Sequence, residues 1–306
     1  MKDKKKTLFI LLFLAPALIA FAMFYAYPII QIFVTSFCKW DYTNLANPQL
    51  LPKGERLANF KYIFTQYPYF WEALRNSFGW ALVGVVIQVP LTLVVAIVFS
   101  KGLRFSKASR NIYIIPSVIS SAAMGLIFLQ LYNPRYGPLQ QVFRFFKPGF
   151  RDSILLVPKA NFWAIVFAYV FFCGTTAIML LGQIHSIPPE MYEAAMLDGA
   201  TGLKRELYVT IPLIMPTIKT VTILAATSGF LLYNEVFFLT NGAAGTKSIS
   251  FIIRELAITS TRTQYARANT IGLIQLVLGL GLVAVINIIF GLNKNSAGGG
   301  FTNEES

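Results

Sequence analysis

The chain has 306 residues, of which 56% are hydrophobic and only 13% are charged, and its mean hydropathy is +0.60. This number of charged residues is too small to cover the surface of a soluble protein of this length. The composition therefore excludes a water-soluble globular domain and indicates an integral membrane protein. The charges that remain are unbalanced, with a formal net charge of +13 at pH 7.

Crossing roughly 30 Å of hydrocarbon takes about 20 helical residues, and six apolar runs in the sequence reach that length. These runs lack the alternating pattern of a membrane β-barrel, and helices satisfy their own backbone hydrogen bonds. We therefore predict an all-α polytopic membrane protein with six transmembrane helices. The predicted spans cover residues 8–38, 78–99, 112–131, 162–184, 217–240 and 270–291.

The first predicted span follows the lysine-rich start Met1-Lys-Asp-Lys-Lys-Lys6. Secretory signal peptides open in the same way, and Ala20-Phe21-Ala22 offers a small-x-small cleavage site. The apolar run continues for about fifteen residues past that site, which is too long for a signal peptide. We therefore predict an uncleaved first helix.

Positive charge sets the expected orientation, because cytoplasmic loops near span ends are enriched in Lys and Arg. The lysines of the N-terminus follow this rule, and so does the short loop between the second and third spans. We therefore expect both termini and the loop of residues 185–216 to lie in the cytoplasm. The basic residues of the short loop are Lys101, Arg104, Lys107 and Arg110.

The loop of residues 185–216 is polar and helix-prone, yet it lies between two apolar runs of membrane length. Ser186 can cap a helix, and Pro188 and Pro189 suit its first turn. Glu190 and Glu193 lie near the positive end of the helix dipole. We predict a short helix over about 188–198, with small side chains on one narrow face that another protein could approach closely. That face consists of Met191, Ala194, Ala195 and Asp198.

Two glycines, Gly199 and Gly202, then allow a sharp turn into a second predicted helix over residues 203–210. Pro212 and Pro216 separate this second helix from the next span. An ordinary connector on a membrane protein would need no further role. A hydrophilic segment with a close-packing face nevertheless favours a partner protein outside the bilayer.

The spacing in this loop resembles the EAA cytoplasmic loop of the permease subunits of binding-protein-dependent ABC importers. Glu193-Ala194-Ala195 is followed after three residues by Gly199, and a β-branched-x-aliphatic-Pro run ends at Pro212. The run Ile187-Pro-Pro-Glu-Met-Tyr-Glu-Ala-Ala, with Asp198-Gly199-Ala200 after it, is similar to the carbohydrate branch of that family, the maltose-type and multiple-sugar permeases. The resemblance covers about residues 60–291.

The resemblance implies the transmembrane domain of a type I ABC importer in the cytoplasmic membrane of a bacterium. It implies a second permease subunit, expected to be a different chain, and a cytoplasmic ATPase dimer that uses ATP and Mg²⁺. It also implies an external solute-binding protein that delivers a sugar or oligosaccharide. This chain is expected to contact membrane lipid and to bind no cofactor or nucleic acid. The residues implied to couple the ATPase to the spans are Glu193, Ala194, Ala195, Asp198, Gly199 and Pro212.

On this basis the chain has three expected parts. Residues 1–76 form the first transmembrane helix and an outer loop, and residues 77–291 form the permease core with five helices and the EAA loop at 186–212. Residues 292–306 form a flexible, polar cytoplasmic tail without a folding signal.

In the sugar branch of the family, the spans before and after the EAA loop contact the substrate. Aromatic faces suit the C–H face of a sugar ring, and hydroxyl or amide groups suit its hydroxyls. Such residues also serve ordinary packing and helix–helix hydrogen bonds. A carboxylate at membrane depth usually faces a cavity or a partner, although Glu235 has the alternative of a place near the outer interface. The expected pathway residues are Phe171, Phe172, Thr175, Thr176, Ser228, Gly229, Tyr233, Asn234 and Glu235.

The three expected outer loops, residues 39–76, 132–160 and 241–269, carry fourteen Lys and Arg against five Asp and Glu. A basic vestibule raises the local concentration of anionic solutes. An acidic oligosaccharide, such as a uronic-acid oligomer, is therefore a hypothesis beside neutral sugars. The alternative is that these charges contact lipid headgroups or an acidic binding protein.

The sequence contains no Walker A loop, nucleophile elbow or paired-carboxylate constellation. Cys38 and Cys173 show no metal or redox spacing, and His185 is the only histidine. We therefore predict a transport subunit without a catalytic or metal site, with ATP hydrolysed by a separate chain. Two alternatives remain: an importer of the same fold for another polar solute such as an amino acid or phosphate, and a membrane-embedded enzyme or autonomous channel.

Overall fold

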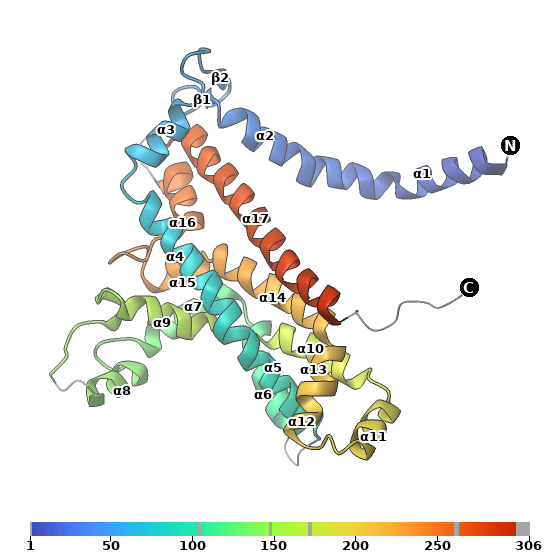
Figure 1. Cartoon of the computed structure of the whole chain (residues 1–306). Coiled ribbons are helices and arrows are strands. Elements are labelled where there is room, and N and C mark those ends of the chain that lie inside the picture. Colours follow the sequence, from blue (N-terminus) through green and yellow to red (C-terminus); the bar gives the residue numbers. More distant parts are fainter. Residues whose placement is uncertain (1, 103–105, 147–148, 171–172, 260–262, 298–306) are drawn as a thin grey trace. The chain divides into compact units, whose positions relative to one another are not determined.

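A computed structural model of the protein (Figure 1) describes residues 2–102, 106–146, 149–170, 173–259 and 263–297. These residues form helices joined by loops. Their only strands are β1 (Cys38–Lys39) and β2 (Gln49–Leu50), which pair antiparallel with Cys38 opposite Leu50. The predicted all-α fold is confirmed.

Four helical segments of the described chain are long and apolar enough to cross a membrane, and they correspond to the first, second, fifth and sixth predicted spans. Two of them contain a short π-helical segment, η1 in the first and η2 in the second. The four are Phe9–Thr35, from α1 (Lys2–Phe21), η1 (Ala22–Ala26) and α2 (Tyr27–Thr35); Phe70–Ser100, from α4 (Phe70–Val83), η2 (Gly84–Gln88) and α5 (Val89–Ser100); Met215–Leu239, from α14 (Met215–Phe230) and α15 (Asn234–Leu239); and Tyr265–Gly291, within α17 (Tyr265–Ala297).

The third and fourth predicted spans are each a pair of helices with a bend between them. α6 (Ser106–Val118) and α7 (Ser121–Leu131) meet at 106°, and α9 (Ala160–Val170) and α10 (Gly174–His185) meet at 46°. The described chain therefore has six spans when each bent pair counts as one.

The break between α6 and α7 corrects the expectation of one uninterrupted helix over residues 112–131. Pro116 lies inside α6 and has no N–H for the helix ladder. Ser120 has an extended backbone, with φ −60° and ψ 142°, and its Oγ accepts a hydrogen bond from the Ala123 N–H at 3.3 Å. A serine in this role starts a new helix, so α7 begins in a new direction at Ser121.

Shorter elements connect the spans. Outside the 185–216 loop they are α3 (Ala58–Thr65), α8 (Pro138–Phe146), the 3-10 turn η3 (Ile154–Leu156), α16 (Ile249–Arg254) and the π-helical η5 (Glu255–Thr259). The 185–216 loop contains α11 (Pro189–Leu197), α12 (Leu203–Arg205), the π-helical η4 (Glu206–Thr210) and α13 (Ile211–Leu213).

The chain divides into two compact units, residues 1–70 with 252–277 and residues 71–251 with 278–306. In the first unit, polar side chains tie the end of α2 to the elements around it. Asn269 on α17 donates a hydrogen bond to Thr35 Oγ1 at 2.7 Å. Asn59 on α3 donates to the carbonyls of Ser36 and Cys38, both at 2.9 Å.

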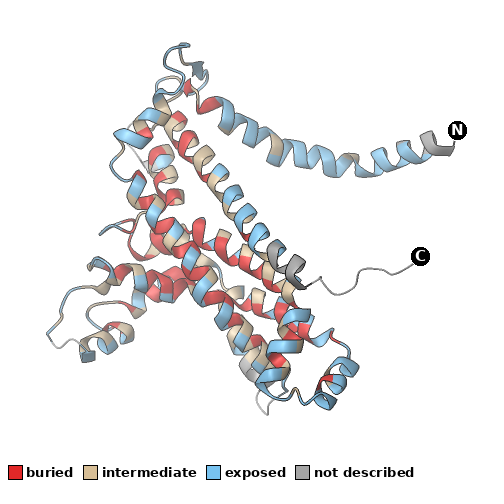
Figure 2. Cartoon of the chain, in the orientation of Figure 1, coloured by how far each residue is buried: buried red, intermediate tan, exposed pale blue. Residues whose placement is uncertain are grey.

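The first span is exposed along most of its length, up to the end of α2 (Figure 2). The most apolar window of Phe9–Thr35 contains no buried residue, and the side chain of Phe13 is 76% exposed. In a membrane, lipid or another protein covers such a helix.

The second unit contains two buried hydrophobic clusters. One includes Trp80 of α4, Ile165 and Tyr169 of α9, and residues of α7 and α15. The other includes Leu180 of α10, Val221 of α14 and residues of α5. The two clusters pack the spans of the second unit against one another. The 185–216 loop and a polar cavity, both described below, are built on these packed spans.

Two helices of the second unit approach each other closely at glycines. A Cβ on Gly84 would lie 2.7 Å from the Ala225 carbonyl oxygen, and a Cβ on Gly229 would lie 2.5 Å from the Trp80 carbonyl oxygen. The Tyr169 hydroxyl donates to the same Ala225 carbonyl at 2.8 Å. The α4–η2 helix therefore packs backbone to backbone against α14, which only small residues permit.

We expect Gly229→Ala to destabilise the protein, because the added methyl group would overlap the Trp80 carbonyl. Overpacking of this kind costs about 1–3 kcal/mol, and it should lower Tm measured in detergent. Gly182→Ala is the matched control, since Gly182 lies in α10 with no atom within 4 Å of an added Cβ. That variant should keep or slightly raise Tm, and equal Tm values for the two variants would contradict the close contact.

Candidate functional site

The first helix of the 185–216 loop, α11, begins at Pro189 after Pro188, which has the extended ψ of 136°. The expectation that Ser186 caps this helix is wrong. Ser186 instead ends α10, where its N–H donates to the Gly182 carbonyl at 3.2 Å and its hydroxyl donates to the Gln183 carbonyl at 2.8 Å. Pro188 and Pro189 thus start α11 by their fixed φ, without a side-chain cap.

The end of α11 depends on a glycine in the left-handed conformation. Gly199 has φ +75°. Its N–H donates to the Met196 carbonyl at 3.1 Å, and the Ala200 N–H donates to the Ala195 carbonyl at 2.8 Å. This pair of bonds is a Schellman motif, in which glycine after the C-cap satisfies the last carbonyls of the helix. The Asp198-Gly199 pair therefore fixes where α11 stops and the turn begins.

Glu206 is a buried carboxylate in the second half of the loop, with 6% of its side chain exposed. Its Oε1 lies 2.9 Å from Arg205 Nη2 and 3.5 Å from Lys101 Nζ. Its Oε2 accepts a hydrogen bond from the Thr210 hydroxyl at 2.8 Å. Because Lys101 directly follows α5, Glu206 joins the loop to the end of the second span.

A tyrosine extends these contacts to α11. The Tyr192 hydroxyl lies 3.4 Å from Thr210 Oγ1, and the Arg205 guanidinium carbon lies 5.1 Å from the centre of the Tyr192 ring. The helix α11, the π-helical turn η4 and the end of α5 are therefore connected through one polar network.

The electrostatic balance at Glu206 favours the charged form. Burial acts to raise the pKa of Glu206, but hydrogen bonds from Arg205 and Thr210 and the charges of Arg205 and Lys101 outweigh it and lower the pKa. A carboxyl group whose folded pKa is depressed adds stability above its unfolded pKa of about 4.3, and that stability is lost as pH falls through the folded pKa. At neutral pH the network is intact.

Sequence reasoning missed this network. The Glu206–Thr210 spacing of four residues was a readable signal, since such side chains are neighbours on a helix. The pairing of Glu206 with Lys101 was not readable, because the two residues are far apart in the sequence and only tertiary packing brings them together.

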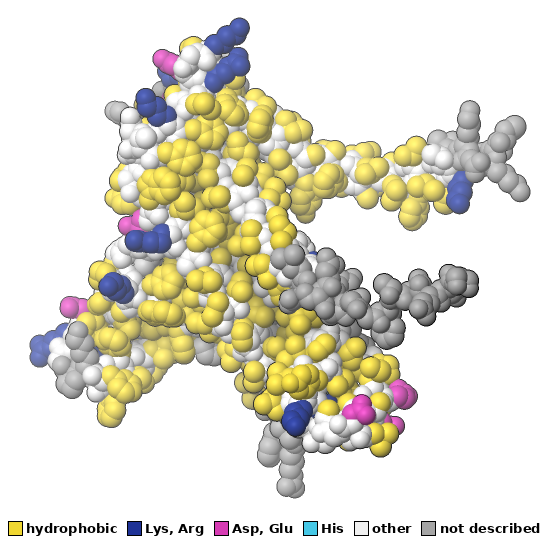
Figure 3. All heavy atoms as spheres, in the orientation of Figure 1, with side chains coloured by type: hydrophobic (Ala, Val, Ile, Leu, Met, Phe, Trp, Pro, Cys, Tyr) yellow, Lys and Arg dark blue, Asp and Glu magenta, His cyan; other side chains and the backbone are white. Residues whose placement is uncertain are grey.

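The loop exposes large apolar side chains although it lies outside the spans. Leu197 is 90% exposed. In Figure 3 the lobe that carries α11 shows hydrophobic side chains beside acidic ones. An apolar patch bordered by polar residues marks an interaction surface. The large exposed apolar residues of the loop are Met191, Met196, Leu197, Leu203, Leu207, Tyr208 and Leu213.

The residues implied for coupling occupy different environments. Glu193, Ala194 and Pro212 are exposed, whereas Ala195 is 8% exposed. The expectation that Ala195 lies on an open face is therefore corrected, because Ala195 is buried within the chain. Its three companions on the predicted face, Met191, Ala194 and Asp198, are exposed.

A polar cavity of about 310 Å³ lies among α7, α9, α14 and α15. Glu235 in this cavity is 8% exposed, and the Asn234 side chain donates to Ser121 Oγ at 2.7 Å. Four of the expected pathway residues, Ser228, Tyr233, Asn234 and Glu235, are among those that line the cavity. The full lining is Ser121, Tyr169, Ser228, Leu231, Leu232, Tyr233, Asn234 and Glu235.

The other expected pathway residues lie elsewhere. Gly229 is buried against the Trp80 backbone. Thr175 is exposed on α10, and the Thr176 hydroxyl donates to the Cys173 carbonyl at 2.8 Å. Phe171 and Phe172 lie outside the described residues.

No three His, Cys, Asp or Glu side chains of the described residues come together in a group that could hold a metal ion. Cys38 and Cys173 are both buried and free. Cys173 Sγ lies 2.6 Å from the Tyr113 hydroxyl, and His185 is exposed at the end of α10.

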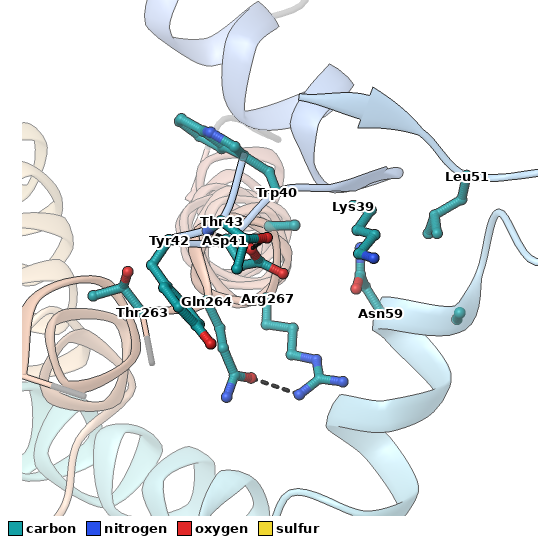
Figure 4. Close-up of a pocket in the computed structure, with 12 residues that line it drawn as sticks. Lys39, Trp40, Asp41, Tyr42, Thr43, Leu51, Asn59, Thr263, Gln264 and Arg267 are labelled. Carbon is teal, nitrogen blue, oxygen red and sulfur yellow. Dashed lines mark hydrogen bonds between the residues drawn. The ribbon is translucent and has the colours of Figure 1, made fainter. Parts of the chain in front are cut away.

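The first unit has a cavity of its own, of about 540 Å³, between the 39–59 segment and the start of α17 (Figure 4). Hydrogen bonds from the Thr43 hydroxyl and N–H, with the charges of Lys39 and Arg267, lower the pKa of Asp41. Arg267 also donates to Gln264 Oε1, as the dashed line in Figure 4 marks. The charged residues that line this cavity are the cations Lys39 and Arg267 and the carboxylate of Asp41.

The spans, the exposed loop tied to a span end and the polar cavity define a class of protein, the helical transmembrane subunit of a transporter. Residues 88–295 match the family described as binding-protein-dependent transport system inner membrane component. The match covers more than half of the chain, and the chain belongs to this family.

Similar proteins extend over nearly the whole chain. The "Probable ABC transporter permease protein" of Pyrococcus horikoshii is 30% identical over 284 residues, which cover 90% of this chain and 93% of that protein. The multiple sugar-binding transport system permease protein of Streptococcus mutans is 29% identical, over 90% of this chain and 92% of that protein. The arabinooligosaccharides transport system permease protein of Bacillus subtilis is 25% identical, over 90% of this chain and 86% of that protein.

Among solved structures, a chain of a bacterial ABC transporter involved in the import of the acidic polysaccharide alginate has a TM-score of 0.77 to this chain. The two are 21% identical, and the likeness covers 94% of this chain and 97% of the other. The shared fold is that of an ABC importer transmembrane domain, as the resemblance in the sequence implied.

We expect Lys101→Met to loosen the loop, because it removes one partner of the Glu206 carboxylate. Lys101 is 40% exposed on its side chain, so the loss should be about 1 kcal/mol. Proteinase K should then cleave the turn between α11 and α12 about fivefold faster when the opening equilibrium governs cleavage. Lys204→Met removes an equal charge from an exposed neighbour with no ion pair to a described residue, and it should leave the cleavage rate unchanged. Equal rates in both variants would contradict the role of the network.

Proposed function

We propose that this chain is a permease subunit of an ATP-driven importer that carries a sugar or oligosaccharide across the cytoplasmic membrane of a bacterium. One observation carries the proposal: the 185–216 loop exposes an apolar surface outside the spans and is tied through Glu206 and Lys101 to the end of a span. A surface of this kind suits a partner that moves the spans.

Relatives support the substrate class. The names of similar permeases specify arabinooligosaccharides, galactooligosaccharides and multiple sugars as cargo. The cavity of about 310 Å³ falls within the volume range of small-molecule sites. Its hydroxyl, amide and carboxyl groups match the hydroxyls of a sugar, and Tyr233 offers an aromatic face.

The proposed partner of the loop is a cytoplasmic ATPase dimer that binds ATP and Mg²⁺. The dimer can bias inward-facing against outward-facing states only through contacts that differ between the two states. Glu193 and Ala194 on α11 and Asp198 at its C-cap are exposed and suit such a contact, while Gly199 sets where the helix ends. In this proposal both termini and the loop are cytoplasmic.

The remaining proposed partners are a second permease, expected to be a different chain, and an external solute-binding protein. A passage between spans needs walls on all sides, and the exposed first span of this chain is available to a second subunit or to lipid. The description of the family as binding-protein-dependent supports the delivery partner.

Expression of the chain with its neighbouring genes should test the assembly. We expect an affinity-tagged chain to copurify with an ATPase and a second permease, and the complex in proteoliposomes should take up labelled oligosaccharide only when ATP and the binding protein are present. Identification of the copurified subunits by mass spectrometry is the first measurement. Full uptake by the chain alone, as a monomer, would refute the proposal.

We expect Gly199→Arg and Glu193→Lys to uncouple ATP hydrolysis from transport. The arginine cannot adopt φ +75° without strain of about 1–2 kcal/mol, and the lysine reverses a charge on the exposed part of α11. Neither change touches a span, so membrane insertion should persist while uptake per ATP falls at least about tenfold, which corresponds to a coupling free energy of about 1.4 kcal/mol.

Matched controls exist for both variants. Gly149 also has positive φ and no atom within 4 Å of an added Cβ, but it lies in an expected outer loop. Glu55 is an exposed acidic residue in another expected outer loop. Gly149→Arg and Glu55→Lys should keep normal coupling, and normal uptake by the two α11 variants would remove the coupling role.

A further inference from the structure

A second cavity of the second unit, of about 590 Å³, lies at the start of α4. Glu72 and Arg75 line it from the first turns of α4, and Lys159 lines it just before α9. Ala244 and Gly245 contribute the backbone of the loop after α15.

This cavity lies at the opposite end of a span from the 185–216 loop. The segments α4, η2 and α5 form one helical span of 31 residues, about 46 Å long at 1.5 Å per residue. Glu72 lies near its beginning, and Lys101, which pairs with Glu206, directly follows its end. The helix is long enough to cross the membrane, so a cytoplasmic 185–216 loop places the cavity on the outer side.

Two buried asparagines hold the loop that forms one wall of the cavity. Asn161 of α9 donates to the Ala244 carbonyl at 2.8 Å. Asn76 of α4 donates to the carbonyls of Gly245 and Lys247 at 2.8 and 3.0 Å. Both asparagines are more than nine-tenths buried, so this wall is fixed before any ligand arrives.

Backbone strain is concentrated at the same place. Three non-glycine residues of the described chain have positive φ, and two of them, Lys159 at 68° and Ala244 at 51°, line this cavity. L-residues rarely adopt this conformation unless their surroundings impose it, and such residues cluster at recognition sites.

An aromatic wall is anchored in the core. The Phe162 ring stacks on the buried Trp80 ring, with centres 5.4 Å apart and planes at 8°. Phe162 also meets Trp163 edge to face at 5.7 Å. Trp163 is 56% exposed, so its indole can pack against a ligand while the aromatic rings behind it hold its position.

The charges around the cavity are not balanced. Arg75 and Lys159 are exposed, and neither forms an ion pair with a described residue. Glu72 is the one acidic residue among those that line the cavity. Two cations against one carboxylate favour a ligand that carries negative charge.

We propose that this cavity is an external recognition site for a sugar unit that bears a carboxylate, such as a unit of a uronic-acid oligosaccharide. Trp163 packs against the C–H face of the ring, Arg75 and Lys159 donate to the carboxylate, and Glu72 accepts from ring hydroxyls. The proposal rests on the proposed function, because the cavity is external only if the 185–216 loop is cytoplasmic.

The shape of the site favours a solute over a docked protein. Its volume of about 590 Å³ lies in the range of small-molecule pockets, which are concave and carry a few fixed polar groups. A stable protein interface buries about 800 Å² on each partner, which is far more than this cavity presents.

Binding to the permease–ATPase complex in nanodiscs, without the binding protein, tests the proposal by calorimetry. The probes are trimers of galacturonate, glucuronate and mannuronate, each paired with its methyl ester, which has the same length and no charge. In at least one series the acid should bind about tenfold tighter than the ester at low ionic strength, and the difference should shrink in high salt. The double variant Arg75→Gln/Lys159→Gln should bring the ratio close to one.

Three further variants separate charge from structure. Lys53→Gln/Arg56→Gln removes the same charge from exposed outer-loop residues and should keep the preference for the acid. Lys159→Gly removes one cation and relieves its backbone strain, so it should lower the preference without lowering Tm. Trp163→Leu should weaken binding of acid and ester alike.

Each contrary outcome is distinct. No preference for the acid in any of the three series, or an equal loss in the Lys53/Arg56 control, overturns the proposal. A pocket variant that keeps the preference but weakens docking of the binding protein also overturns it and assigns the surface to protein contact. If no ATPase assembles with the chain, the proposed function fails with it, and this is seen before any titration.

Discussion

The close contact between α4–η2 and α14 is the constraint on which the second unit depends. At Gly84 and Gly229 no side chain separates the two helices, and each glycine lies directly against a carbonyl of the other helix. Backbones in such contact fix the relative positions of their helices, because a shift in either one creates an overlap or a void. Ser228, beside Gly229, lines the polar cavity. The contact at Gly229 therefore helps to fix the position of this wall of the cavity.

The same helix connects that contact to the 185–216 loop. η2 continues into α5, and Lys101 after α5 reaches the Glu206 carboxylate. Glu206 in turn holds Thr210, which lies beside Tyr192 of α11. A chain of side-chain contacts of 2.8–3.5 Å therefore links α11 to the end of the second span. Coupling between distant sites requires such contiguous elements with more than one arrangement.

The features that local chemistry determines could be predicted from the sequence. Spans follow from hydropathy, since a bilayer forces backbone hydrogen bonds into helices, and α11 lies within one residue of its predicted bounds at each end. Gly199 was predicted to turn the chain and does so with positive φ. Features set by tertiary contacts could not be predicted from the sequence: Ser186 ends the preceding helix, and Ala195 is buried. The sequence did not specify which of the expected pathway residues face a cavity. Gly229 packs against the Trp80 backbone, whereas Asn234 lines the polar cavity.

The two polar cavities of the second unit differ in the charged side chains that line them, and that difference affects the passage of a charged solute. The cavity at the start of α4 presents the cations Arg75 and Lys159 beside one carboxylate, Glu72, whereas the cavity beside Ser228 presents Glu235 and no cation. Passage requires that binding be favourable enough for entry and weak enough for release. A carboxylate-bearing solute would therefore be held at the first cavity and not retained at the second, where only neutral groups of the solute find partners. In the proposed pathway, selection and passage would then use different chemistry in the two cavities. α4 carries side chains of the first cavity and packs against α14, which lines the second.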